Sequence, residues 1–435
     1  MYRKLLSLAM VLCLILAVFA GCGGGTQSAG SSEAPSQQST DSGDAAASGD
    51  TLKIGAVYPL TGDVAAIGQN IKRGIDFAVE EINAAGGVNG MQIEIVWGDT
   101  QGDPKVGMSV AEKLITSDDV TVLLGCYQSA VTEVVSQVAE KYQVPMLTAI
   151  STANQLTTHD YQYFFRLAPT NSIFLRSMIE YLVELDKTAD IEIKTISIIA
   201  DNTLLGQETA QWARYWGEQY GLEVLTEVLY TQGAADLTSE VLTLKSANAD
   251  ALVCDNYISD GILLTKTMAE QDYKPQVMVG KATAYIDPTF IPNTGAISNG
   301  ISTALEWNPD LTKGLEINAA FKAKYDVDMN GHSAEAYTAV WILKTAIEQA
   351  GSLDRGEIRE AMANLTIEGS FPNGPEIILP YDTISFDTVE WDGIKHTNTN
   401  ANAVVAVAQI QDGVLKTVWP FDYTENEVII PAPFQ

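Results

Sequence analysis

The apolar and polar positions of this chain repeat with two alternating periods from residue 51 onward. Residues 52–58 (LKIGAVY) form an apolar run that predicts a buried strand, and residues 66–84 repeat isoleucine at helical spacing from Ile67. The same rhythm predicts strands at 92–97, 120–124 and 145–149, and helices at 106–115 and 130–142. Strands separated by helices indicate a parallel sheet covered by helices on both faces.

The alternation starts again after a crossing at Pro169-Thr170-Asn171. It predicts helices at 174–185, 206–220, 237–246 and 261–270, and strands at 195–200, 222–229, 251–254 and 276–279. Two units of about 120 residues each agree better with ordinary domain sizes than one very large sheet does. We therefore expect an α/β protein with two doubly wound lobes.

The last part of the chain departs from this rhythm. Helices are predicted at 314–325, 333–350 and 355–365, and residues 403–420 alternate like two antiparallel strands turned at Asp412-Gly413. The length of 435 residues predicts two or three domains at about 150 residues each.

Residues 1–21 have the three-part pattern of a secretory signal peptide. Arg3 and Lys4 make a positive start, an uncharged apolar run follows over 5–20, and small residues precede Cys22. The apolar run is short for a membrane span, which needs about 20 residues. The sequence VFAGC that ends at Cys22 resembles a bacterial lipobox, which implies acylation of this Cys. An ordinary cleavable signal with an incidental Cys is the alternative.

Residues 23–50 are rich in Ser, Gly, Gln and Ala and contain no large apolar side chain. This composition is typical of a flexible linker, whose reach is roughly 30 Å. We expect residues 22–50 to be a lipidated Cys followed by a tether. The protein would then lie on the extracytoplasmic face of the cell membrane, held by its lipid anchor.

The charge balance is strongly acidic. The chain has 25 Lys plus Arg against 55 Asp plus Glu, a formal net charge of −30, and removal of the signal peptide takes away only Arg3 and Lys4. Nucleic-acid binding needs clustered basic residues, so a nucleic-acid partner is not expected. The acidic residues are interpreted as a solvated surface.

Signatures of catalysis and of cofactors are missing from the sequence. There is no GxxxxGK[ST] phosphate loop, no GxGxxG turn after the first strand and no GxSxG elbow. The three histidines, at 159, 332 and 396, form no HExxH motif, so we expect no histidine-rich metal site. These absences favour a binding protein without a cofactor over an enzyme.

Ligands of doubly wound sheets bind beyond the carboxyl ends of the strands. The predicted strand 120–124 is followed by the run from Gly125 through Gln128 to Ser129, and the strand 145–149 is followed by Ser151-Thr152. Hydroxyls and free backbone N–H groups at a helix start would hold a carboxylate. Simple N-capping is the alternative for Ser129 and Thr152.

The second unit has its own strand ends. Asp255-Asn256-Tyr257 follows one predicted strand and Lys281 follows another. Tyr257 would pack its ring on a ligand, or it would be an ordinary aromatic at the rim. Lys281 would pair with an acidic group of a ligand, or it would be a solvated lysine.

Taken together, several motifs resemble the solute-binding lipoproteins of ABC importers of the leucine/isoleucine/valine-binding type. The most specific stretches lie at 54–62, 65–69, 74–78, 80–90 (EEINAAGGVNG) and 103–104. The match covers essentially residue 51 to the C-terminus.

This resemblance implies a type I periplasmic-binding-protein fold, with two doubly wound lobes joined by three hinge strands that close around a ligand. Lobe 1 would comprise 51–169 plus about 306–396, and lobe 2 would comprise 170–305 plus about 397–435. By this resemblance, Ser129, Ser151 and Thr152 would bind an amino acid's charged groups. Tyr127 and Ile67 would line the pocket, and Tyr257 would close over the ligand.

Two positions depart from the family pattern. Lys281 stands near where the family's amino acid binders usually have an acid, and Leu205 replaces a family tyrosine. Two like charges about 4 Å apart repel by roughly 4 kcal/mol at an effective dielectric of 20. Either Asp255 or Asp201 therefore supplies the acidic group that binds a ligand ammonium, or the ligand is a small carboxylate that has no ammonium group.

Three functions fit these observations. The leading hypothesis is a monomeric receptor that binds a branched-chain amino acid or a related small carboxylate and delivers it to an ABC permease. A ligand sensor of the same fold that reports to a signalling partner is the second. An amide hydrolase is the third, with His159 as the histidine nearest to the predicted strand ends. Cys126 and Cys254 lie near the predicted strand ends of the two units, and we expect both to be free thiols.

Overall fold

The computed structural model describes residues 51–188, 191–311, 314–368, 378–391, 393–421 and 424–430. The predicted signal peptide, Cys22 and the tether to residue 50 lie outside the described residues. Among the helices that are described, none combines the length and the apolar character that a membrane crossing needs.

Lobe 1 is the part of the molecule built around a seven-stranded sheet in the order β13-β14-β5-β4-β3-β1-β2. The strands are β1 (Leu52–Tyr58), β2 (Ile93–Asp99), β3 (Val122–Gly125), β4 (Met146–Thr148), β5 (Phe164–Arg166), β13 (Asp387–Trp391) and β14 (Ile394–Thr399). All neighbouring pairs are parallel except β13 and β14. The predicted parallel sheet is therefore confirmed, and a later hairpin extends it at one edge.

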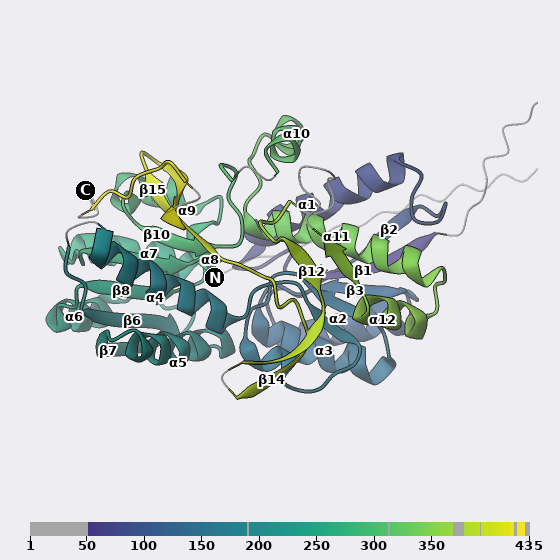
Figure 1. The fold of residues 1–435 in the computed structure, drawn as a ribbon, viewed down its shortest axis with the longest axis horizontal. Helices are drawn as coiled ribbons and strands as arrows, with labels where there is room; N and C mark the ends of the chain where they lie inside the picture. Colours follow the sequence, from purple (N-terminus) through teal and green to yellow (C-terminus); the bar gives the residue numbers. More distant parts are fainter. Residues whose placement is uncertain are drawn as a thin grey trace, which may run out of the picture. The chain divides into compact units, whose positions relative to one another are not determined.

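Lobe 2 is built around a second seven-stranded sheet in the order β16-β15-β10-β9-β8-β6-β7. The strands are β6 (Thr195–Asp201), β7 (Glu223–Tyr230), β8 (Ala251–Asp255), β9 (Val277–Lys281), β10 (Ser302–Leu305), β15 (Ala406–Gln411) and β16 (Val414–Trp419). The strands β15 and β16 are antiparallel to each other, as predicted for the tail. Both lobes thus repeat one plan, with parallel strands in the centre and a late antiparallel pair at the edge (Figure 1).

Helices follow most of the parallel strands. Those of the first repeat are α1 (Ala65–Ala84), α2 (Pro104–Thr116) and α3 (Ser129–Tyr142), with the short η1 (Asn154–Thr157). The second repeat has α4 (Asn171–Thr188), α5 (Leu204–Gln219), α6 (Thr238–Ala247), α7 (Ile258–Glu270), α8 (Ala282–Tyr285), α9 (Phe290–Thr294) and η2 (Gly295–Ser298). The later helices are α10 (Leu315–Tyr325), α11 (Gly331–Ala350) and α12 (Arg355–Ala363), followed by the small pair β11 (Thr366–Glu368) and β12 (Thr383–Ser385).

The chain passes between the two sheets three times. It leaves the first sheet after β5, returns from the second sheet after β10, and leaves again between β14 and β15. Helix α11 lies against α1, as Figure 1 shows. A Cβ on Gly74 of α1 would lie 2.3 Å from the carbonyl oxygen of Ser333 in α11, so glycine is needed for this close contact. The exact lobe boundaries stay a prediction.

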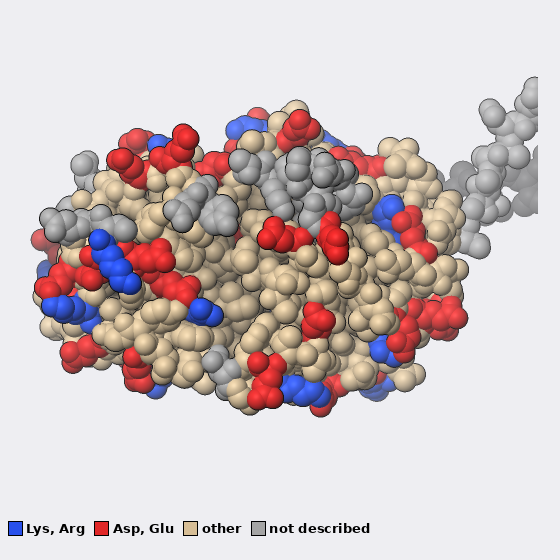
Figure 2. Space-filling view, in the orientation of Figure 1, with Lys and Arg blue, Asp and Glu red and all other residues tan. Residues whose placement is uncertain are grey.

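Acidic side chains are dispersed over the face of the molecule in Figure 2 rather than gathered in one patch. Several carboxylates at the surface are paired with a nearby cation, as in the half-buried pairs Lys72–Asp76 and Lys344–Glu348. Surface pairs of this kind contribute about 0–1 kcal/mol each. On this face the acidic residues form a solvated surface, as the sequence indicated.

Candidate functional site

A small cavity lies between the two lobes at the carboxyl ends of their central strands. Its volume is about 20 Å³, which is enough for about one water molecule. The two lobes are therefore in contact around it, and a larger ligand would need them to separate. Its lining comes from both lobes and consists of Tyr127, Ser129, Ile150, Thr152, Leu205, Tyr257, Lys281, Ala282, Thr283, Glu306 and His332.

Lobe 1 brings hydroxyls and a helix start to the cavity. Helix α3 begins at Ser129 itself, one residue earlier than predicted, and its N-cap position is Gln128. The Ser129 hydroxyl accepts a hydrogen bond of 3.4 Å from the backbone N–H of Ala153. Thr152, which follows β4, is buried and faces lobe 2. This arrangement offers hydroxyls beside the positive end of a helix, a setting that favours an anion.

Aromatic rings from the two lobes meet across the cavity. The ring centroids of Tyr127 and Tyr257 are 5.9 Å apart at an interplanar angle of 71°. The ring of His332 lies edge-on to Tyr127, with centroids 5.4 Å apart. These contacts close the aromatic side of the cavity when the lobes are together.

Lys281 reaches across the cleft from lobe 2 to lobe 1. It ends β9, is 2% exposed, and its Nζ donates a hydrogen bond of 2.6 Å to Thr152 Oγ1. The alternative of a solvated lysine is therefore wrong. Burial lowers the pKa of Lys281, and the negative charge of Asp255 opposes this shift. A buried ammonium at a ligand cavity is a strong attractor for a carboxylate.

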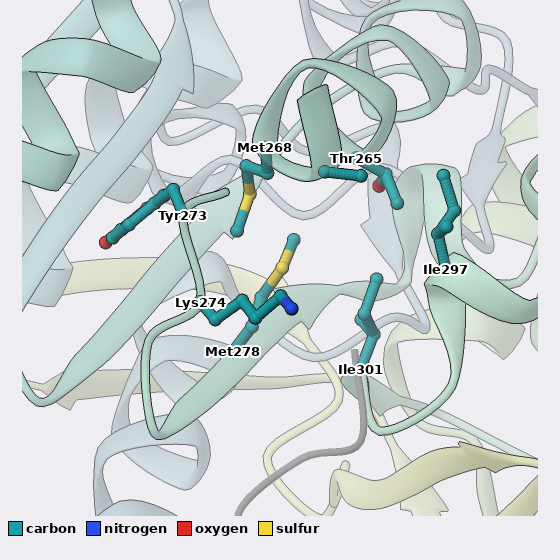
Figure 3. A pocket seen from close by; sticks show the side chains of 8 residues that line it. Thr265, Met268, Tyr273, Lys274, Met278, Ile297 and Ile301 are labelled. Atoms are coloured by element: carbon teal, nitrogen blue, oxygen red, sulfur yellow. The ribbon is translucent and has the colours of Figure 1, made fainter. Parts of the chain in front are cut away.

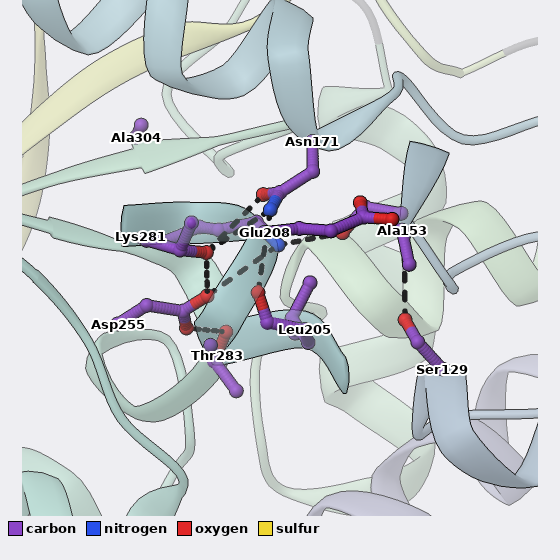
Figure 4. A network of polar contacts seen from close by, with 12 residues as sticks. Ser129, Ala153, Asn171, Leu205, Glu208, Asp255, Lys281, Thr283 and Ala304 are labelled. Carbon is purple, nitrogen blue, oxygen red and sulfur yellow. Dashed lines mark hydrogen bonds and ion pairs between the residues drawn. The ribbon is translucent and has the colours of Figure 1, made fainter. Parts of the chain in front are cut away.

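Asp255 anchors the charged side of lobe 2. Its carboxylate lies 3.7 Å from Lys281 Nζ and accepts hydrogen bonds from Thr209 Oγ1 at 2.7 Å and Thr283 Oγ1 at 2.8 Å. Figure 4 shows Lys281, Asp255 and Thr283 pointing toward one another. Asp201 is a second buried acid, and burial together with the charge of Asp255 raises its pKa to about 6. Asp255 is thus already committed to protein partners.

A second contact across the lobes uses Glu208 of α5. Its carboxylate accepts hydrogen bonds from the backbone N–H groups of Asn154 and Gln155 in lobe 1, the latter at 3.0 Å. Burial raises the pKa of Glu208, and these two backbone donors act in the opposite direction. Glu208 therefore clamps the start of η1 when the lobes are in contact.

Glu306, His332 and Glu335 form a buried cluster beside the cavity. One ligand atom of each lies within 4.8 Å of the others, and Nδ1 of His332 is 3.4 Å from a carboxylate oxygen of Glu335. Burial raises the pKa of Glu306 to about 7 and that of Glu335 well above its usual range. Burial and the charge of Lys281 lower the pKa of His332 to about 3. Loss of solvation thus disfavours the charged form of each of the three groups.

The structure brings six of the residues considered from the sequence to the cavity, namely Tyr127, Ser129, Thr152, Leu205, Tyr257 and Lys281. The other four, Ser151, Asn256, Gln128 and Ile67, are not among its lining residues. Ser151 donates to the carbonyl oxygens of Cys126 and Tyr127, and Asn256 bonds the hydroxyls of Tyr230 and Tyr285. Gln128 lies against Gly102, and Ile67 packs in the core around α1.

Sequence reasoning did not single out Glu306, His332 or Glu335 as site residues. The last two are three positions apart on α11, a spacing that places side chains on one face of a helix. That spacing was a usable signal. Glu306 had no local signal, because only the pairing of β10 with β9 brings it near Lys281.

Three other side chains considered from the sequence are not among the lining residues of the cavity. Cys126 and Cys254 are buried free thiols, and burial raises the pKa of both, that of Cys254 to about 12. His159 is 31% exposed and pairs with Glu133. It is not part of the cavity lining, which removes the geometric basis for a hydrolase centred on it.

A second cavity, of about 90 Å³, lies within lobe 2. Met268 and Met278 project into it, with Thr265, Ile297 and Ile301 around them (Figure 3). Its lining is mainly apolar and comes from lobe 2 alone, so movement of the lobes would not open or close it.

A family model described as periplasmic binding protein matches residues 51–411. The protein named Leu/Ile/Val-binding protein homolog 7 of Brucella suis is 29% identical over 404 residues, which cover 89% of this chain and 96% of that protein. Homolog 8 of Brucella abortus is 29% identical over 398 residues, covering 88% of this chain and 93% of that protein.

Two solved structures share the fold. The substrate-binding protein of a branched-chain amino acid transporter from Streptococcus pneumoniae, in complex with isoleucine, has a TM-score of 0.72 at 23% identity, covering 88% of this chain and 100% of that one. A solute-binding protein of an ABC transporter from R. palustris, in complex with benzoate, has a TM-score of 0.71 at 18% identity, covering 88% and 97%. With two doubly wound lobes around a shared cavity and a family match over most of its length, this chain belongs to the periplasmic binding proteins and has their type I fold.

Proposed function

We propose that this protein is the extracytoplasmic receptor of an ABC importer and that it binds a small carboxylate between its lobes. The family match and the relatives named as Leu/Ile/Val-binding homologs support the receptor role. The neighbouring structures hold isoleucine in one case and benzoate in another, and both ligands carry a carboxylate. The choice between an amino acid and a simple acid depends on the charges in the cavity.

The buried contact between Lys281 and Thr152 is the observation that carries this proposal. A ligand carboxylate between the start of α3 and Lys281 would gain charge-assisted hydrogen bonds from the lysine and from hydroxyls of lobe 1. A ligand ammonium about 4 Å from Lys281 would be repelled by roughly 4 kcal/mol at an effective dielectric of 20. Asp255, whose carboxylate lies 3.7 Å from Lys281 Nζ, offsets part of this repulsion. The cavity therefore favours an acid without an ammonium at this place.

Binding works by closure of the lobes. A carboxylate that touches Thr152 in lobe 1 and Lys281 in lobe 2 is held fully only when the lobes are together, so it shifts the population toward the closed form. The clamp between Glu208 and the start of η1 stabilises the same form. The permease would then recognise the closed, loaded receptor.

The N-terminal sequence supports a location of this receptor at a membrane surface. Acylation of Cys22 would anchor the protein, and the 23–50 linker would let a monomeric body move within roughly 30 Å of the anchor. Such a tether keeps the receptor near its permease. Mass spectrometry of the mature N-terminus in a bacterial host tests this step, and an unmodified Cys22 would contradict it.

Calorimetric titration with matched ligand pairs tests the choice of ligand. Leucine is compared with isocaproate, which is leucine without its amino group, and phenylalanine with hydrocinnamate. We expect the simple acid of a pair to bind at least about tenfold more tightly, since about 1.4 kcal/mol is a factor of ten. Tighter binding of leucine than of isocaproate would overturn the carboxylate proposal while leaving the receptor role intact.

A further inference from the structure

One buried group of side chains has no role in the proposed binding of a carboxylate. Glu306 follows β10, and His332 and Glu335 lie three residues apart at the start of α11. All three are at most 4% exposed. They come from two elements far apart in sequence, so the fold rather than a local turn brings them together.

Four polar atoms of this cluster make no hydrogen bond to the described part of the protein. They are both carboxylate oxygens of Glu335, Oε2 of Glu306 and Nδ1 of His332, and all four are buried. Leaving a buried polar atom unpaired costs about 1–3 kcal/mol, and more for a charged one. Four such atoms in one place therefore call for a partner that accepts electron pairs from all of them.

We propose that Glu306, His332 and Glu335 bind a divalent transition-metal ion of the zinc class. An imidazole nitrogen and two carboxylates are ligands that zinc takes in proteins, at about 2.0–2.2 Å. Bonds of that length at a tetrahedral angle hold neighbouring ligand atoms about 3.4 Å apart. The observed separation between His332 Nδ1 and the Glu335 carboxylate is 3.4 Å.

The same distance argues against an ammonium in this place. An ammonium donates hydrogen bonds of about 2.8 Å in tetrahedral directions, so its acceptors lie about 4.6 Å apart. His332 Nδ1 and the oxygen of Glu335 are closer together than this, whereas the cluster as a whole spans up to 4.8 Å, so it is this one pair that disfavours an ammonium. Glu335 also does not line the cavity between the lobes, so a ligand that fills only this cavity would not contact it.

Movement of the lobes would give an ion access to the cluster. Glu306 and His332 line the cavity, so separation of the lobes exposes the cluster to solvent. Gly331 lies beside it, and a Cβ at that position would come within 2.6 Å of Glu306 Oε2. With three protein ligands, a tetrahedral ion would keep one position open toward the cavity, the pattern of zinc sites that also bind a small molecule.

The ion would balance the charge of the cluster. Two ionised carboxylates neutralise a divalent cation, which lessens its repulsion from nearby Lys281. That lysine is also held by Asp255 at 3.7 Å and by Thr152. The metal site and the carboxylate position thus use different side chains around the same cavity.

Equilibrium dialysis of the full chain against zinc chloride, with metal content measured by mass spectrometry, tests the proposal. Glu335→Gln keeps the shape of the side chain and removes its charge, and His332→Asn removes the imidazole. We expect each variant to lose one bound zinc ion per chain relative to the unmodified protein, with affinity at least about 100-fold lower. Cobalt added in place of zinc should give visible absorption bands of a tetrahedral site in the unmodified protein only.

The other two histidines provide matched controls. His159→Asn changes an exposed histidine and His396→Asn a buried one, and both should retain the zinc ion and the cobalt bands. Thermal melting of every variant shows whether it is folded. Equal zinc content in the unmodified protein and in folded Glu335→Gln would overturn the metal site.

A second arm separates this site from the carboxylate site. Lys281→Met should lose isocaproate and keep zinc, whereas Glu335→Gln should lose zinc and keep a folded, closing receptor. If Glu335→Gln instead abolishes leucine binding and no zinc binds to the unmodified protein, the cluster holds an ammonium and the metal proposal is overturned.

Discussion

The two lobes contribute different chemistry to the cavity between them. Lobe 1 supplies the hydroxyls of Ser129 and Thr152 beside a helix start, and α11, which packs against α1, adds His332 to the lining. Lobe 2 supplies Lys281 with its partner Asp255, both at most 2% exposed. Hydroxyls at a helix start suit any carboxylate, whereas a buried lysine discriminates between ligands by charge. We therefore infer that lobe 1 provides general affinity and lobe 2 provides selectivity.

Removal of Lys281 should have the largest effect, because it removes the charge selectivity that we assign to lobe 2. Lys281→Met takes away the charge that faces lobe 1, and the loss of a charged hydrogen bond of about 1.5–3 kcal/mol lowers isocaproate affinity by about 10- to 150-fold. Leucine should lose less affinity than isocaproate, or gain some. Lys274→Met, at an exposed lysine of the same lobe, is the control. Unchanged isocaproate affinity in Lys281→Met by calorimetry would refute selectivity by charge.

Removal of the Thr152 hydroxyl on lobe 1 should lower ligand affinity less than removal of Lys281 does. It should affect acids and amino acids equally. Thr152→Val keeps the shape of the side chain but removes the acceptor of the lysine bond. The cost of one hydrogen bond to a charged group is about 1.5–3 kcal/mol at most, so we expect roughly a tenfold loss of affinity for acids and amino acids alike. Thr158→Val, at an exposed threonine, serves as the control. A loss confined to one ligand class would place selectivity on lobe 1.

The clamp between the lobes should affect closure rather than selectivity. Glu208→Gln replaces a carboxylate that accepts two backbone N–H bonds by an amide with one oxygen. The closed form becomes less populated, so apparent affinity falls by a few fold for every ligand. Small-angle scattering should show a larger radius of gyration at subsaturating ligand. Identical scattering for Glu208→Gln and the unmodified protein would exclude the clamp.

The smallest expected effect concerns stability and pH at the edge of lobe 1. Burial and the charge of Arg166 lower the pKa of His396 to about 4, below the unfolded value of about 6.5. The unfolded chain therefore binds the proton first, and stability is lost as pH falls from about 6.5 toward 4. Relative to His396→Asn, the unmodified protein should lose on the order of 1–2 kcal/mol more between pH 7 and pH 5.

Urea unfolding at the two pH values measures this difference, with His159→Asn as the exposed control. The comparison between variants is needed because buried acids such as Asp201, whose pKa is raised to about 6, change stability in the opposite direction. The same loss in both proteins would show that His396 is protonated in the fold.

The sequence predicted the central strands and most long helices of both lobes because each carries a strong period of its own. The prediction of β1 at 52–58 is confirmed residue for residue, and the helix 130–142 begins only one residue early, at Ser129. Strands of three residues, such as β4 and β5, are too short for a period. The strand β4 was found because its apolar run follows a helix, whereas β5 was missed and becomes a strand through pairing with β4.

The candidate site was predictable where it follows a strand directly. Thr152, Tyr257 and Lys281 each come just after or at the end of a central strand, and all three line the cavity. The state of Lys281 could not be predicted, because its burial depends on Thr152, more than a hundred positions away. Glu306 likewise could not be predicted as a site residue, since it reaches the cavity through the second passage between the lobes, directly after β10.

A crystal structure of the protein with isocaproate tests the central claim most directly. The account predicts closed lobes, with the ligand carboxylate within hydrogen-bond distance of Lys281 Nζ and of a hydroxyl of Ser129 or Thr152. A carboxylate bound elsewhere, with Lys281 still joined only to Thr152 and Asp255, would contradict it.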